Sequence, residues 1–148
     1  MKSIDLSNFK TQNVTNMSYM FYNCCSLKEI NLSNFKIDKV INMSSMFEKC
    51  SSLINLNLSN FIINKVTDLN HMFSNCSSLS NLIISDFDTS NVNNMSYMFN
   101  NCDSLTNINL SNFNTQNVKY MNYMFNGCIF LKKNNVVCND NKILNLFE

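Results

Sequence analysis

The stretch NVTNMSYMFYNC at residues 13–24 decides the fold of this chain, because its pattern returns four more times. The cysteine that closes it recurs every 26 residues, at Cys24, Cys50, Cys76, Cys102 and Cys128. A Met-Phe pair precedes each of these cysteines in the same phase. A fixed period of roughly 20–50 residues is typical of a stacked repeat architecture. The sequence therefore predicts an array of stacked units.

A strand-like segment lies between successive copies of this stretch. The segment I-D-L-S-N-F at residues 4–9 returns in variant form at 30–35, 56–61, 82–87 and 108–113. Its alternation of apolar and polar residues is typical of a β-strand. In such a strand Ile30 and Leu32 face the core, whereas Glu29, Asn31 and Ser33 face away from it.

A helical spacing follows each predicted strand. Val14, Met17, Met20 and Phe21 fall at i, i+3, i+6 and i+7, which indicates one apolar face of a short helix. Two residues after each phenylalanine stand Asn23, Lys49, Asn75, Asn101 and Gly127. All but Lys49 are Asn or Gly, the residues that favour left-handed backbone at the end of a helix. We therefore predict a short helix that ends in a tight turn in every unit. The variable connector before it, residues 10–13 in the first unit, is predicted to be a surface loop.

The two ends of the array differ. Residues 1–133 carry the 26-residue period, and residues 134–148 are interpreted as a degenerate last strand followed by a C-terminal cap. Ile143, Leu144 and Phe147 give that tail an apolar side. The first unit has no comparable cover, which indicates either missing upstream sequence or end-to-end self-association.

The cysteines and the histidine are interpreted as structural residues. A regular spacing of 26 is not the clustered pattern of a metal site, and a column of five thiols cannot pair fully. We predict buried, reduced packing residues, with Cys25 and Cys138 as the more exposed thiols. His71 has no oriented partner for catalysis and is predicted to be a solvated helix residue. The Met-Phe pairs are interpreted as core packing, and no catalytic residue, metal ligand or cofactor is predicted.

Composition excludes several function classes. Eleven basic and ten acidic residues give a net charge of +1, and no basic stripe indicates a nucleic-acid partner. No apolar run approaches the roughly 18–20 residues that cross a membrane, and the N-terminus lacks the apolar region of a signal peptide.

The two motifs together resemble a known repeat. L-x-x-[IL]-x-[LI]-S-N-F and N-V-x-x-M-x-x-M-F-x-x-C in phase over about residues 3–133 resemble the bacterial surface protein 26-residue repeat of the BspA-type leucine-rich repeat family. The resemblance implies an α/β leucine-rich-repeat solenoid of about five repeats, with a parallel β-sheet on one face and short helices on the other. It also implies a non-enzymatic adhesion or protein-interaction module, at the cell surface or secreted within a longer chain, that binds host or matrix proteins. Asn34, Asn60 and Asn112 are expected to face inward and to bond the backbone.

The strand face that points away from the core is the predicted binding surface, because solenoids bind partners on extended concave faces. A protein or glycan partner is expected there, and the exposed apolar Ile83 interrupts an otherwise polar column. The predicted binding residues are Glu29, Asn31, Asn55, Asn57, Asn81, Ile83, Asn107 and Asn109. Two alternatives stay open: a polar face that only keeps the array soluble, and a cytoplasmic repeat scaffold or self-assembling structural protein.

Overall fold

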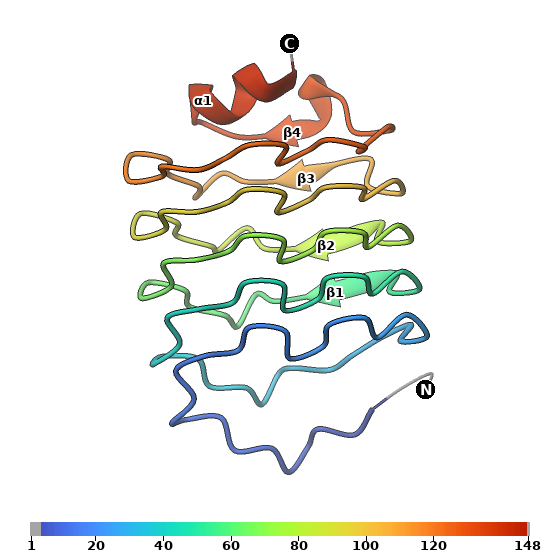
Figure 1. Cartoon of the computed structure of the whole chain (residues 1–148), viewed down its shortest axis with the longest axis vertical. Coiled ribbons are helices and arrows are strands. Elements are labelled where there is room, and N and C mark those ends of the chain that lie inside the picture. Colours follow the sequence, from blue (N-terminus) through green and yellow to red (C-terminus); the bar gives the residue numbers. More distant parts are fainter. Residues whose placement is uncertain (1–3, 148) are drawn as a thin grey trace.

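The chain winds into a stack of coils, shown in a computed structural model that describes residues 4–147 (Figure 1). Residues 26 positions apart lie beside one another along the stack. Single parallel bridges join Asn16 to Asn42, Asn42 to Asp68, Asp68 to Asn94 and Asn94 to Tyr120. One period of the sequence is therefore one coil.

One face of the stack carries the strands, which are β1 (Asn55–Asn57), β2 (Asn81–Ile83), β3 (Ile108–Asn109) and β4 (Val136–Val137). β1 pairs with β2 and β3 pairs with β4, both in parallel. Leu56 is buried between the exposed Asn55 and Asn57, so the predicted alternation is confirmed there. Segments 4–9 and 30–35 form no strand among the described residues, although Leu6 and Leu32 are buried as predicted.

The opposite face is built from turns, and the prediction of short helices there is wrong. We call residues 14–24, 40–50, 66–76, 92–102 and 118–128 the turn segments. In the second of them Met46 N–H bonds the Met43 carbonyl and Glu48 N–H bonds the Ser45 carbonyl, which makes overlapping four-residue β-turns. Ser45 and Lys49 take φ values of 55° and 63°. A right-handed helix cannot continue through such left-handed residues.

Hydrogen bonds to the next coil replace the helical ones. Alternate residues of a turn segment donate their N–H groups to carbonyls of the following segment: Met43 to Asp68, Ser45 to Asn70, Phe47 to Met72 and Lys49 to Ser74. These backbone N–H groups are hydrogen-bonded, as they would be in a helix, but their acceptors belong to the neighbouring coil. The same apolar stripe faces the core in both arrangements, so periodicity alone could not separate them.

The core lies inside the stack and consists of columns of like residues. The rings of Phe21, Phe47, Phe73, Phe99 and Phe125 stack with centroids 5.3, 5.9, 5.6 and 5.2 Å apart. Such offset aromatic pairs add to the stabilisation that comes from burial. Met46, Met72 and Met98 beside them are fully buried, which confirms the core role of the Met-Phe pairs. The connectors are less exposed than predicted, because Thr11, Ile37 and Ile63 point into the core.

The tail crosses the last coil at the top of Figure 1. The 3-10 helix η1 (Lys133–Asn135) precedes β4, and α1 (Asn141–Leu144) and the 3-10 helix η2 (Asn145–Phe147) follow it. Ile143 is completely buried, and the Phe147 ring lies 4.7 Å from that of Phe125, so the tail extends the phenylalanine column by one ring. The carboxylate of Asp140, which caps α1, accepts hydrogen bonds from Thr115 N–H and Oγ1 at 2.8 and 2.7 Å.

Left-handed backbone occurs in two columns, of which one was predicted. Asn23, Lys49, Asn75, Asn101 and Gly127 all have positive φ, although they end turns rather than helices. A second column also has positive φ: Tyr19, Ser45, His71, Tyr97 and Tyr123. These residue types give no signal of left-handed backbone, so the sequence could not reveal it.

Replacing Gly127 by alanine should lower the free energy of unfolding by about 1–2 kcal/mol, the usual penalty of a β-carbon in left-handed backbone. Gly127 has φ of 80°, and an added methyl group would also press on Asn101. The reverse change, Lys49→Gly, should raise the free energy of unfolding by up to about 1 kcal/mol. Urea unfolding measures both, and a Gly127→Ala variant as stable as the parent would contradict the assignment.

Candidate interaction surface

All eight predicted binding residues lie on the protein surface. β1 and β2 place Asn55 opposite Asn81 and Asn57 opposite Ile83, in one in-register patch. Asn107 and Asn109 lie at β3, and Glu29 and Asn31 lie in the coil before β1; all four are exposed. Ile83 has 38% of its surface exposed, which makes it the apolar residue of this patch. We call these eight residues the strand face.

Three strand-face asparagines also have a structural role that the sequence analysis missed. The Oδ1 atoms of Asn31, Asn57 and Asn109 accept the N–H of the serine two residues later, at 3.0, 2.9 and 3.0 Å. This local turn bends the chain at the end of the strand. Ile83 occupies the same column and cannot form the bond. The amide nitrogens of the three asparagines have no protein partner within residues 4–147, so they can still donate to a ligand.

The chemistry of the strand face is that of neutral amides. Asn55 and Asn81 form no side-chain hydrogen bond within the described part of the chain, and each can both donate and accept. Glu29 is the charged member of the eight. A face of this kind matches neutral polar groups, such as peptide backbone and sugar hydroxyls.

A second set of asparagines joins the coils. Asn34 Nδ2 donates to the Leu6 carbonyl at 2.9 Å, and Asn60 Nδ2 donates to the Leu32 carbonyl at 3.1 Å. Asn112 bonds the Ser85 carbonyl at 2.8 Å. The predicted backbone bonds are confirmed. The predicted inward orientation is wrong, because all three residues are exposed.

The cysteines form a buried column of thiol donors. Cys50, Cys76, Cys102 and Cys128 are buried, and all seven cysteines are free thiols. Each buried thiol donates to a phenylalanine carbonyl of the preceding coil, at 2.9–3.1 Å. Burial raises the pKa of the Cys50 thiol to about 12 and raises that of Cys76 further. The exposure predicted for Cys25 is confirmed. Cys138 is half-buried against Asp140, so it is more exposed than the four buried thiols, as predicted, but it is not a fully exposed thiol.

Alkaline pH should destabilise the protein through this column. The folded pKa of Cys50 lies above the ordinary value of 9.0. The protonated thiol therefore makes its full contribution to the free energy of unfolding below pH 9, and this contribution is lost between pH 9 and about pH 12. At pH 10 the parent should lose about 1 kcal/mol more unfolding free energy than Cys50→Ser, which has no thiol there to titrate. Urea unfolding at pH 7 and pH 10 under reducing conditions measures the difference. Equal losses in both proteins would contradict the prediction.

The comparisons with known proteins agree with this fold. The family model described as "Mycoplasma protein of unknown function, DUF285" matches residues 1–83 and, in a second match, residues 51–146. The chain belongs to this family. No curated protein matches the DUF285 chain.

Two solved structures resemble the DUF285 chain. A leucine-rich repeat protein from Eubacterium ventriosum is 21% identical, with a TM-score of 0.55 over 86% of this chain and 30% of its own. A leucine rich cell surface protein from Faecalibacterium prausnitzii is 20% identical, with a TM-score of 0.44 over 95% of this chain and 43% of its own. The first likeness shows the leucine-rich-repeat fold. The DUF285 chain spans less than half the length of either protein.

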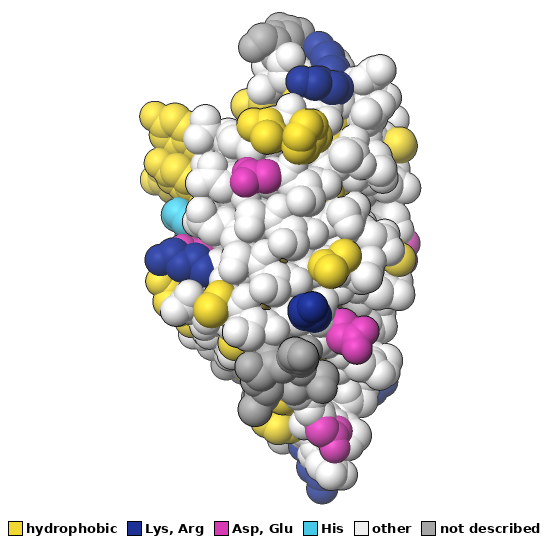
Figure 2. Space-filling model, turned by 90° about the vertical axis from the view of Figure 1, so that its right-hand side faces the viewer, with side chains coloured by type: hydrophobic (Ala, Val, Ile, Leu, Met, Phe, Trp, Pro, Cys, Tyr) yellow, Lys and Arg dark blue, Asp and Glu magenta, His cyan; other side chains and the backbone are white. Residues whose placement is uncertain are grey.

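His71 belongs to an aromatic column rather than to a solvated helix, so that prediction is wrong. Its ring is half-buried and stacks on Tyr97 at 4.6 Å, and Nδ1 lies 3.0 Å from Asn70 Oδ1. Tyr97 stacks in turn on Tyr123 at 5.0 Å. Figure 2 shows hydrophobic side chains gathered beside the single histidine. The recurrence of Tyr or His at the same repeat position is the sequence signal that could have revealed this column.

Residues 4–147 of the DUF285 chain hold neither a cluster of metal ligands nor a membrane-spanning helix. These residues contain no group of three or more His, Cys, Asp and Glu side chains that could hold a metal ion. No helix in this range is long and apolar enough to cross a membrane.

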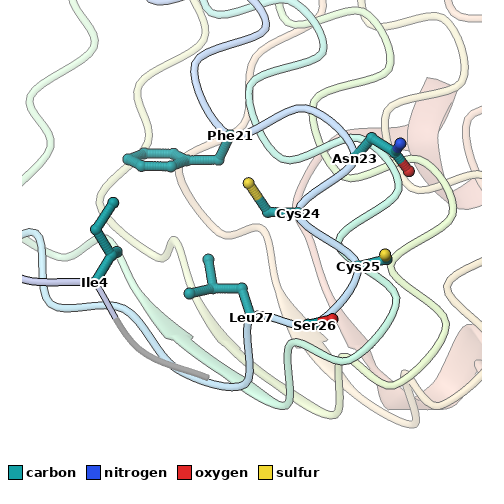
Figure 3. A pocket seen from close by; sticks show the side chains of 7 residues that line it. All are labelled: Ile4, Phe21, Asn23, Cys24, Cys25, Ser26 and Leu27. Atoms are coloured by element: carbon teal, nitrogen blue, oxygen red, sulfur yellow. The ribbon is translucent and has the colours of Figure 1, made fainter. Parts of the chain in front are cut away.

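The N-terminal end of the stack opens onto a hollow of about 200 Å³ (Figure 3). Ile4, Phe21 and Leu27 point toward this space, whereas Asn23 and Cys25 turn away from it. Its walls are side chains whose equivalents in later units are covered by the preceding coil. Among the described residues, the hollow is therefore lined mainly by core side chains and offers no converging set of polar groups for a ligand.

Proposed function

We propose that this DUF285 chain is a non-enzymatic interaction module of a BspA-like leucine-rich-repeat protein, at the cell surface or secreted within a longer chain. It binds a protein or glycan partner on the strand face. In this proposal residues 1–133 are the repeat array and residues 134–148 are its C-terminal cap. The observation that carries the proposal is the in-register patch of Asn55, Asn57, Asn81 and Ile83, which joins amides with an exposed isoleucine.

Two energetic arguments support this patch. Interfaces gain most of their energy from a few central contacts, and an apolar side chain among polar neighbours can serve as such a contact. The β1–β2 pairing fixes the backbones of Asn55 and Asn81 side by side, so little backbone freedom is lost when they bind.

The test is a double substitution on the strand face. Asn57 is a poor choice for a charge, since its side chain holds the turn at Ser59. Ile83→Asp with Asn81→Arg changes the patch without removing a backbone bond. The partner is first identified by screening purified matrix proteins and glycans, and its affinity is then measured. We expect a loss of at least about tenfold for this variant.

The matched control is Ile62→Asp with Asn64→Arg. Ile62 has 61% of its surface exposed and lies on a connector, so the same residue types change away from the strand face. This control should bind as the parent does. Equal affinities for both double variants would end the strand-face proposal.

Location is tested separately by protease treatment of intact source cells, with an antibody to the chain and a cytosolic protein as control. Loss of the antibody signal while the control survives supports a surface module. Protection until lysis would favour the alternative, a cytoplasmic scaffold or a self-assembling array. End-to-end self-association is a separate proposal, and light scattering at rising protein concentration tests it.

A further inference from the structure

The hydrogen bonds between turn segments point the same way in four adjacent rows. In the first row the N–H groups of Met17, Met43, Leu69 and Met95 each donate to a carbonyl of the next coil toward the C-terminus. The rows that begin at Tyr19, Phe21 and Asn23 have the same direction. One neighbouring row, at Ile41, Thr67, Asn93 and Lys119, runs the other way. An ordinary parallel sheet would balance the two directions within each strand.

This shared direction gives the stack a polarity like that of a helix. Peptide dipoles aligned head to tail leave partial positive charge at the end where N–H groups are exposed. Here that is the C-terminal end of the stack, where the rows finish at Met121, Tyr123, Phe125 and Gly127. Within residues 4–147 none of these four N–H groups has a hydrogen-bond acceptor.

The cap covers part of this end and already places an anion there. Phe147 lies over Phe125, and the Asp140 carboxylate takes the N–H and hydroxyl of Thr115. At Thr115, the donors of the last coil are thus hydrogen-bonded to a negative group that the tail supplies. Within residues 134–147 the tail supplies none for Met121 and Tyr123.

An open hollow of about 670 Å³ lies at these two residues. Met121 and Tyr123 line it together with Lys119 and Lys142, and Leu146 of η2 closes one side. Both lysines are exposed and can turn toward a ligand. Among the described residues, Asp140 supplies a nearby opposing charge, and its carboxylate is engaged by Thr115 and by the N–H of Lys142.

We propose that this hollow binds a tetrahedral oxyanion, the sulfate or phosphate group of a ligand, between the N–H groups of Met121 and Tyr123 and the ammonium groups of Lys119 and Lys142. Backbone N–H groups and lysines form charge-assisted hydrogen bonds with such anions. This site is separate from the strand face and does not depend on the function proposed for it. A second copy stacked head to tail would use the same N–H groups, so the experiment must separate it from an anion.

The experiment is an NMR titration of the full chain with inorganic sulfate and inorganic phosphate, with ionic strength held constant by chloride. We expect saturable shifts of the Met121 and Tyr123 amides with a dissociation constant of about 1 mM. Lys119→Ala with Lys142→Ala should weaken binding about tenfold, whereas Lys28→Ala with Lys65→Ala, two lysines outside the hollow, should leave it unchanged. Glucose 6-sulfate and glucose 6-phosphate then distinguish the two sources of the anion.

Three outcomes would overturn the proposal. The first is the absence of saturable shifts at Met121 and Tyr123. The second is equal binding by the two double-lysine variants, which would indicate general salt effects. The third is a shift of these amides that follows protein concentration without added anion, which would show that a second copy occupies this end.

Discussion

Replacing Phe73 by alanine is expected to lower the free energy of unfolding by about 3–5 kcal/mol, the range for removal of a fully buried aromatic side chain. Phe73 has no exposed surface, and its ring stacks on Phe47 and Phe99 at 5.9 and 5.6 Å. The cavity would open in the middle of the stack, where coils on both sides hold their positions and cannot collapse into it. Because domains are stable by only about 5–15 kcal/mol, much of the stability would be lost.

Thermal and urea unfolding of Phe73→Ala measure this effect. Phe130→Ala is the matched control, since Phe130 has 58% of its surface exposed and should change the free energy of unfolding by less than about 0.5 kcal/mol. Similar losses in the two variants would mean that the phenylalanine column does not form the core.

Replacing Ile143 by alanine is expected to lower the free energy of unfolding by about 2–5 kcal/mol. Ile143 is the fully buried residue of α1 and packs onto the core at the end of the stack. Repeat arrays need a covered end, because an open last coil exposes apolar side chains and unpaired strand edges. A large loss at a position outside the repeat would support the proposal that residues 134–148 are a cap.

Leu146→Ala controls for the loss of an aliphatic side chain in the same tail. Leu146 has 40% of its surface exposed, so this variant should lose about 1 kcal/mol or less. If Ile143→Ala were no more harmful than Leu146→Ala, the tail would not be part of the cooperative fold.

The repeat itself could be predicted from the sequence because each core column repeats one residue type at one interval. Phe21 to Phe125, the buried cysteines and the alternation around Leu56 all have the predicted burial, apart from the half-buried residues at the two ends. The left-handed column at Asn23 and Gly127 was also predictable, since Asn and Gly are the residues that tolerate this backbone.

The helices were wrongly predicted for a physical reason. Met17, Met20 and Phe21 have a spacing that serves a helix and a run of overlapping turns equally well. What excludes the helix is the left-handed backbone at Tyr19, and tyrosine is not a residue type that indicates left-handed backbone in a sequence. Only the stacking of coils, which supplies distant carbonyls to the N–H groups, makes the turns preferable.

The candidate site was predicted by position but not by chemistry. The sequence placed Asn31 and Asn57 on the outer face, where the structure has them. It could not show that their oxygens are already bonded to serine N–H groups, because the same asparagine serves a turn or a ligand. The anion hollow at Met121 and Tyr123 had no sequence signal, since two of its proposed donors are backbone groups and its two lysines, Lys119 and Lys142, lie in different parts of the sequence.

The most direct test of the fold is the scalar coupling across hydrogen bonds, measured by NMR between the amide nitrogen of Phe47 and carbonyl carbons. The stack of turns predicts a coupling from Phe47 to Met72 in the next coil, where the N···O distance is 2.9 Å. A helix over residues 40–50 would instead couple Phe47 to Met43, four residues earlier. Observation of the Met72 coupling would establish the turn face and the direction of its rows, and observation of the Met43 coupling would contradict both.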